Sequence, residues 1–165
     1  MRVNLTEKEK RMKRSLFVAL ATFTVLVLSA SAAQAQSGHF VGTPTCTDIG
    51  TQLQCTGKVA GLGGTTFEIT ATAAGTATVS CTNPAGNVAP GQAFTTAASG
   101  GTGDIPTPRN GSFRFTVTSI APTAPARSCP NPQWTATVTD VAFGDATVSL
   151  SEDGVVSDTI IVPVS

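Results

Sequence analysis

The sequence predicts an all-β protein, an antiparallel immunoglobulin-like β-sandwich with two disulfides. Three observations predict it: apolar and polar residues alternate in short runs, turn residues separate these runs, and Thr, Val, Ala and Gly are frequent after the first 36 residues. Alternation with a period of two places one side of a strand in a core and the other in water. Thr and Val also fit pleated surfaces better than helices. A small closed β-barrel is the alternative, because the pattern alone does not separate the two architectures.

The chain begins with a segment that fits a secretory signal peptide. Lys13 and Arg14 precede an apolar run over residues 16–28, and small residues ending in Ala-Gln-Ala at Ala35 follow. That order is typical of an export leader, and the apolar run is shorter than the about 20 residues of a membrane-spanning helix. We therefore expect residues 1–35 to be a signal peptide that is cut after Ala35.

Residues 36–165 are expected to form one mature domain, with Met12 as an alternative start of translation. The leader through Gln36 contains six of the ten basic residues but only two of the ten acidic ones, which leaves four basic and eight acidic residues. This net charge near −4 argues against nucleic acid and anionic membranes, which both need a basic footprint. We expect a secreted, extracellular monomer that has no contact with the membrane after signal removal.

The alternating runs predict the positions of the strands. These runs cover residues 52–59, 66–72, 76–82, 113–118, 134–139, 146–150 and 156–164. The Asp-Gly pair at Asp153 predicts a hairpin between residues 145–151 and 155–162, because Gly readily adopts the positive φ of such turns. Gly75 predicts a second hairpin within residues 64–82.

Three segments are expected to lie outside the strands. Residues 97–110 are rich in Gly, and residues 121–132 contain several prolines, which lack the N–H that a central strand needs. Both are predicted to be surface loops. His39 and Phe40 are expected in a frayed N-terminal segment, whereas Trp134 is expected in the core.

The cysteines predict two disulfides, since an even number of cysteines in an exported chain favours structural bridges. Of three connectivities we favour Cys46–Cys55, across a hairpin, and Cys81–Cys129, which ties a strand to the proline-rich loop. A metal site is the alternative for these residues. The sequence has no C-x-x-C pair and one histidine, His39, so it predicts neither a metal nor a cofactor.

No catalytic motif is apparent, and we assign no catalytic residue. The sequence lacks a G-x-S-x-G elbow, a phosphate-binding glycine loop and an H-E-x-x-H pair. Carboxylates are the remaining acid–base groups, and those of Glu152 and Asp153 fall in the predicted hairpin turn, where we interpret them as solubilising charges. A carboxylate-dependent hydrolase of the glycoside hydrolase type is therefore the least favoured function.

The leading functional hypothesis is a secreted structural or binding protein that has no catalytic activity and contacts an unknown extracellular partner. The alternative is a carrier of a small apolar ligand. Phe94 and Phe143 each follow a turn-rich segment, and a groove between sheet and loops near these rings would hold such a ligand.

Three segments resemble a pattern of small secreted bacterial proteins of unknown function. They are G-x-V-x-G-L-G at residues 57–63, V-x-C-x-N-P-x-G-N-x-x-P-G-Q at residues 79–92, and W-T-A-T-V-T-D-V-x-F at residues 134–143. This resemblance implies secretion and no particular activity. The chain is also loosely similar to the carrier apoproteins of enediyne antibiotics, which are secreted immunoglobulin-like sandwiches with two disulfides. That similarity concerns the fold alone, because none of their motifs is present.

Mass spectrometry of the secreted protein tests the leader and the cysteines together. We expect the mature chain to begin at Gln36 and to weigh less than the reduced chain by the hydrogens lost in two disulfides. A leader retained on the secreted protein, or thiols that react with an alkylating agent without prior reduction, would contradict this prediction.

Overall fold

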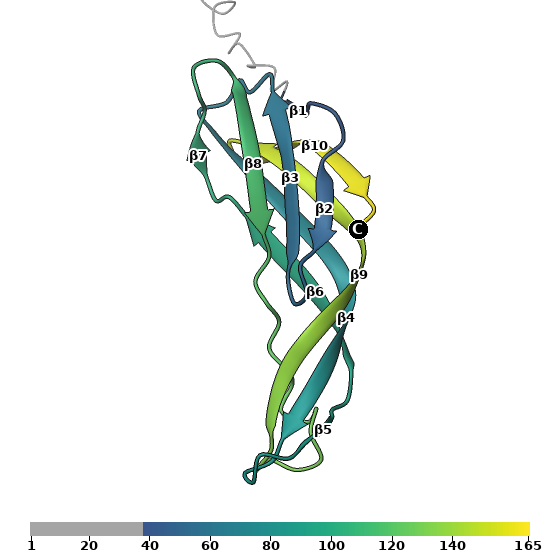
Figure 1. The fold of residues 1–165 in the computed structure, drawn as a ribbon. Helices are drawn as coiled ribbons and strands as arrows, with labels where there is room; N and C mark the ends of the chain where they lie inside the picture. The colour runs from purple at the N-terminus through teal and green to yellow at the C-terminus, as the bar shows by residue number, and fades with distance from the viewer. Residues whose placement is uncertain (1–37) are drawn as a thin grey trace, which may run out of the picture. The chain divides into compact units, whose positions relative to one another are not determined.

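Two antiparallel sheets form a sandwich in the computed structural model, which describes residues 38–165 (Figure 1). Ten strands occur in this part of the chain, four in one sheet and six in the other, and neither sheet closes into a barrel. The all-β sandwich is therefore confirmed and the barrel alternative is wrong. The leader predicted over residues 1–35 lies outside the described residues. No helix of residues 38–165 is long and apolar enough to cross a membrane.

The smaller sheet, sheet A, is built around its central strand β3. One edge of β3 pairs with β8, and the other edge pairs with β1 and then β2. The strands of sheet A are β1 (His39–Phe40), β2 (Thr45–Asp48), β3 (Leu53–Ala60) and β8 (Ser112–Thr118). His39 and Phe40 thus belong to an ordered strand, and the expectation of a frayed segment is wrong because their backbone pairs with Ala60 and Val59.

The larger sheet, sheet B, is built around a single long strand, β4. One edge of β4 pairs with β9 along nearly its whole length, and the other edge pairs in turn with β7, β6 and β5. Strand β10 pairs with the far edge of β9. The strands of sheet B are β4 (Thr66–Thr82), β5 (Val88–Pro90), β6 (Phe94–Gly101), β7 (Ile105–Pro106), β9 (Thr135–Glu152) and β10 (Val155–Val162). In Figure 1, β4 and β9 continue well past the strands of sheet A.

The hairpin predicted at Gly75 is wrong, because β4 runs straight through this residue. Gly75 lies opposite Phe143 at an irregularity in the β4–β9 register. A Cβ atom at Gly75 would lie 2.8 Å from Val141 Cγ1 and 2.9 Å from the Ala142 carbonyl oxygen. The glycine is therefore required by the close approach of β9, not by a turn.

The predicted loop over residues 97–110 is wrong in part, since β6 extends to Gly101 and β7 covers Ile105–Pro106. Its small residues permit close packing beneath β8: a Cβ atom at Gly100 would lie 2.5 Å from the Thr118 carbonyl oxygen. Ala98 is buried in the same strand. Residues 121–132 contain no strand, as predicted, and the 145–151/155–162 hairpin is confirmed by the pairing of β9 with β10.

The main core lies between the two sheets and consists of residues from the inward positions of both. Edge-to-face pairs of rings join across it, with centroids 5.1 Å apart for Phe67 and Phe113 and 6.0 Å apart for Phe40 and Phe115. Ile69 and Leu150, two of the apolar strand positions that alternate with polar residues, are fully buried. Trp134, expected in this core, is only half-buried and precedes β9. That expectation is wrong, because the part of β9 next to Trp134 lies beyond sheet A.

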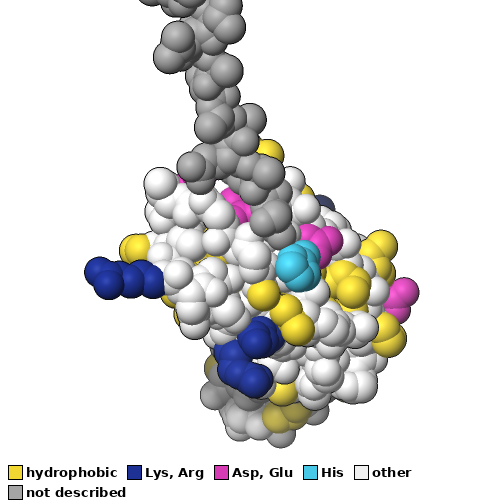
Figure 2. All heavy atoms as spheres, turned by 90° about the horizontal axis from the view of Figure 1, so that it is seen from above, with side chains coloured by type: hydrophobic (Ala, Val, Ile, Leu, Met, Phe, Trp, Pro, Cys, Tyr) yellow, Lys and Arg dark blue, Asp and Glu magenta, His cyan; other side chains and the backbone are white. Residues whose placement is uncertain are grey.

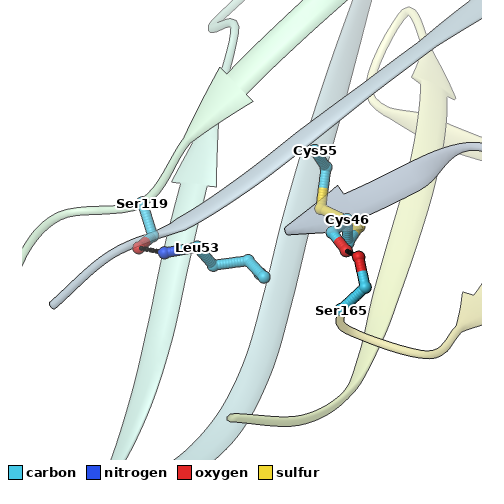
Figure 3. Close-up of a disulfide and its surroundings, with 5 residues drawn as sticks. All are labelled: Cys46, Leu53, Cys55, Ser119 and Ser165. Carbon is cyan, nitrogen blue, oxygen red and sulfur yellow. Dashed lines mark hydrogen bonds between the residues drawn. A yellow bond between two sulfur atoms is a disulfide. The ribbon is translucent and has the colours of Figure 1, made fainter. Parts of the chain in front are cut away.

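Both disulfides have the predicted connectivity. Cys46 and Cys55 lie directly opposite each other on β2 and β3, with Cα atoms 4.1 Å apart. Cys81 near the end of β4 bonds Cys129 of the proline-rich segment, with Cα atoms 5.7 Å apart. Figure 3 shows the first bridge beside Ser165, whose hydroxyl and amide both donate hydrogen bonds to the Cys46 carbonyl oxygen. In the same view the Ser119 hydroxyl accepts a hydrogen bond from the Leu53 amide and so holds the end of β8 to β3.

Replacement of Gly75 tests the close approach of β4 and β9. Gly75→Ala is expected to lower the free energy of unfolding by about 1–3 kcal/mol, because the added methyl overpacks the ladder. Gly144→Ala is the matched control, since its Cβ would meet only the Ala74 carbonyl oxygen at an ordinary 3.6 Å; we expect a change within about 0.5 kcal/mol. Equal effects of the two substitutions in urea unfolding would contradict this account.

Candidate functional site

The two aromatic residues predicted to border a ligand groove lie on one face of sheet B. Phe94 in β6 is opposite Ala77, and Phe143 in β9 is opposite Gly75, so the rings flank β4 at neighbouring inward positions. Both rings are half-buried, and Phe143 packs against the core. The structure thus brings the predicted pair together on one face. A hollow of about 260 Å³ lies along β9 and the proline-rich segment, but neither ring lines it.

Glu152 has a structural position that the sequence interpretation missed. Its side chain is fully buried, and its carboxylate accepts hydrogen bonds from the amides of Gly38 at 3.0 Å, Gly63 at 2.7 Å and Gly64 at 3.2 Å. A carboxylate needs such donors when water is removed from it. Its interpretation as a solubilising charge is therefore wrong. The alternation itself contained the signal, because Glu152 continues the inward series of Val148 and Leu150.

Asp153 occupies the β9–β10 turn and fixes the segment that enters β4. Its carboxylate accepts hydrogen bonds from the Thr65 hydroxyl and from the amides of Thr65 and Thr66. The Thr65 hydroxyl, followed by the Thr66 and Thr65 amides, holds the pKa of Asp153 below its ordinary value of 3.8. Asp153 has φ 48° and Gly154 φ 79°, as the predicted Asp-Gly hairpin turn requires.

Other carboxylates also accept hydrogen bonds from the backbone. Asp158 Oδ2 accepts from the Phe40 amide at 2.9 Å, and Asp48 Oδ1 accepts from the Gly50 amide at 2.8 Å. Among residues 38–165 no group of three or more His, Cys, Asp or Glu side chains is arranged to hold a metal ion. The arrangement of Asp48, Asp153, Asp158 and Glu152 is that of acceptors for loop and edge amides.

The outer face of sheet A contains a basic pair that the sequence interpretation did not single out. Lys58 of β3 and Arg114 of β8 lie directly opposite each other, and Figure 2 shows basic side chains lying together on the surface. Neither side chain forms an ion pair or a hydrogen bond within residues 38–165. Like charges at directly opposed strand positions repel each other, so this pair lowers the stability of the sheet.

A hollow of about 430 Å³ adjoins the basic pair. Val41 and Thr43 of its lining lie in the connection between β1 and β2, where the Val41 amide donates to the Lys58 carbonyl oxygen. Thr45, Thr56 and Thr116 form a row across three strands next to the pair. The residues lining the hollow are Val41, Thr43, Thr45, Thr56, Gly57, Lys58, Arg114, Phe115 and Thr116.

Sequence signals for this hollow are present but incomplete. Lys58 and Arg114 occupy polar positions of their alternating runs, which places each on an exposed face. Their apposition depends on the register between β3 and β8, two strands separated by four others in the chain. No local pattern specifies such a register.

A pH titration tests the role of Asp153. A pKa lowered in the folded state means that the unfolded state binds more protons, so this carboxylate stabilises the fold above about pH 4 and loses that effect as pH falls. Asp153→Asn retains the turn geometry and removes the charge. We expect the variant to melt below the wild type at pH 7 and the difference in Tm to shrink on acidification toward pH 2. A difference that stays constant or grows would contradict the assignment.

Comparisons of this chain with protein-family models, with curated proteins and with solved structures found no match. The resemblance of residues 57–63, 79–92 and 134–143 to small secreted bacterial proteins therefore stays a prediction, as does the immunoglobulin-like relationship.

Proposed function

We propose that the protein is an exported, non-catalytic binding module that contacts its partner through the outer face of sheet A. One observation carries this proposal: Lys58 and Arg114 are opposed without an acidic partner in residues 38–165, beside a hollow of about 430 Å³. A sheet that needed only solubility would separate these charges, because their apposition is unfavourable. A partner that supplies negative charge turns the same apposition into attraction.

The remaining features support a binding role at the cell exterior. Two disulfides suggest an oxidising location, outside the cytoplasm, which agrees with the predicted export leader. Glu152, Asp153 and Asp158 are engaged by backbone amides, so their geometry supports structural roles. A hydrolase would instead need a carboxylate pair that faces a shared groove.

A carrier of a small apolar ligand is the second candidate function. The observation that favours it is the hollow of about 260 Å³ beside β9, which is lined in part by Ala121, Pro122, Ala136 and Val138. A carrier of this kind would bind apolar probes at the proline-rich segment and would be indifferent to Lys58 and Arg114.

Thermal unfolding in the presence of a ligand panel tests the proposed function. The panel contains anionic, neutral and cationic small molecules, and the variant Lys58→Ala/Arg114→Ala is compared with the control Arg109→Ala/Arg127→Ala. The control removes the same charge from two exposed arginines that lie outside the lining of the hollow. We expect an anionic ligand at about 100 times its Kd to raise the Tm of the wild type and of the control by several degrees. The same ligand should leave the Tm of Lys58→Ala/Arg114→Ala unchanged.

Two outcomes would contradict the proposal. One is that no class of ligand stabilises the wild type. The other is that the ligands which stabilise it act equally on Lys58→Ala/Arg114→Ala, which would point to a different surface. Stabilisation by apolar probes alone, unaffected by either double variant, would favour the carrier.

A further inference from the structure

The basic pair is placed to share one oxyanion. Side chains at directly opposed positions of antiparallel strands have Cβ atoms about 4.5–5.5 Å apart, so Lys58 and Arg114 can reach the same small group. The Arg guanidinium offers a planar fork that fits both oxygens of a carboxylate, while the Lys ammonium adds a compact charge. An oxyanion between them would replace repulsion by two charge-assisted interactions.

The charge of the whole domain selects a ligand with few acidic groups. Residues 37–165 contain eight acidic residues and four basic ones, and two of those four form this pair. A long polyanion would meet the net negative charge of the rest of the surface. A short acid interacts mainly with charges within the Debye length of about 8 Å, and the pair supplies two positive charges at the hollow.

The hydroxyl groups around the pair favour a saccharide as the body of the ligand. Thr43, Thr45, Thr56 and Thr116 are exposed around the hollow, and their hydroxyl groups form no hydrogen bond within residues 38–165. Each hydroxyl has one donor and two acceptor sites, which matches the hydroxyls of a sugar. The volume of about 430 Å³ is that of a small-molecule site.

The same lining argues against a nucleotide. Recognition of a base relies on stacking against an aromatic face. The one aromatic residue of the lining, Phe115, is 4% exposed, and its ring packs inward against Phe40. A free phosphate would use the two cations and leave the threonine row without a role.

We propose that this hollow binds a short acidic saccharide, with a carboxylate between Lys58 and Arg114 and sugar hydroxyls at Thr45, Thr56 and Thr116. This inference rests on the proposed function and adds to it the chemical class of the ligand and the role of each residue. The basic pair binds the acid group, and the threonine row selects the sugar.

Isothermal titration of the folded mature domain with digalacturonate tests this inference. We expect binding that weakens about tenfold or more in Lys58→Ala and in Arg114→Ala, and by a few-fold in Thr56→Val and Thr116→Val, because hydrogen bonds to charged groups contribute more than neutral ones. Arg109→Ala is the control and should bind as the wild type does. All substituted positions except Lys58 are exposed, and circular dichroism verifies that each variant is folded.

The arms of the experiment separate failure of this inference from failure of the proposed function. If the neutral disaccharide with both carboxylates reduced to alcohols binds as tightly as digalacturonate, the inference of an acidic ligand is wrong. The proposal that the outer face of sheet A binds a ligand would then still hold. If inorganic phosphate binds as tightly and the threonine variants have no effect, the face is a simple anion site and the saccharide is overturned. If no small molecule of any class depends on Lys58 and Arg114, the proposed function itself fails.

Discussion

The ladder between β4 and β9 is the interaction on which the rest of the fold depends. These two strands pair from Phe67 with Glu152 at one end to Thr82 with Thr135 at the other. One half of the ladder forms a wall of the main core, and the other half continues past sheet A (Figure 1). All other strands of sheet B attach to an edge of this pair. A one-residue change in its register would therefore turn the buried row of β4 or of β9 toward water.

The half of the β4–β9 ladder that continues past sheet A is covered by segments of the chain that form no strand. Ala77, Val79 and Cys81 are buried there outside the main core. The turn between β2 and β3 reaches only the start of this half, where the Val141 amide donates to the Gly50 carbonyl oxygen. The Gly91 amide donates to the Val79 carbonyl oxygen, and the Gln92 amide to that of Ser128. The Cys81–Cys129 bridge then joins the proline-rich segment covalently to β4. A proline-rich segment suits this task, because it covers apolar side chains without competing for the ladder's hydrogen bonds.

Local sequence patterns predicted the features of this protein that depend on neighbouring residues. Alternation found most strands, Asp-Gly found the last hairpin, and cysteine number with strand position found both bridges. The failures at Gly75 and Gly100 have a common physical cause, since each glycine is specified by a contact with a distant segment. Glu152 differs, because the local alternation through Val148 and Leu150 already placed it inward. In the sequence alone, a glycine that is required because another strand approaches closely cannot be distinguished from a glycine that is required by a turn. The basic pair at Lys58 and Arg114 was missed for the same reason, because it exists only once β3 and β8 are in register.

The two ends of the described chain are both anchored within the sandwich. The Gly38 amide is bonded to Glu152 and the Phe40 amide to Asp158, while Ser165 exchanges backbone hydrogen bonds with Cys46 and Asp48 beside β2. A purification handle or fluorescent fusion joined directly at either end would compete with these bonds and strain the edge of sheet A that borders the hollow. The exposed turn between β4 and β5, around Ala85 and Gly86, offers an attachment point remote from that edge.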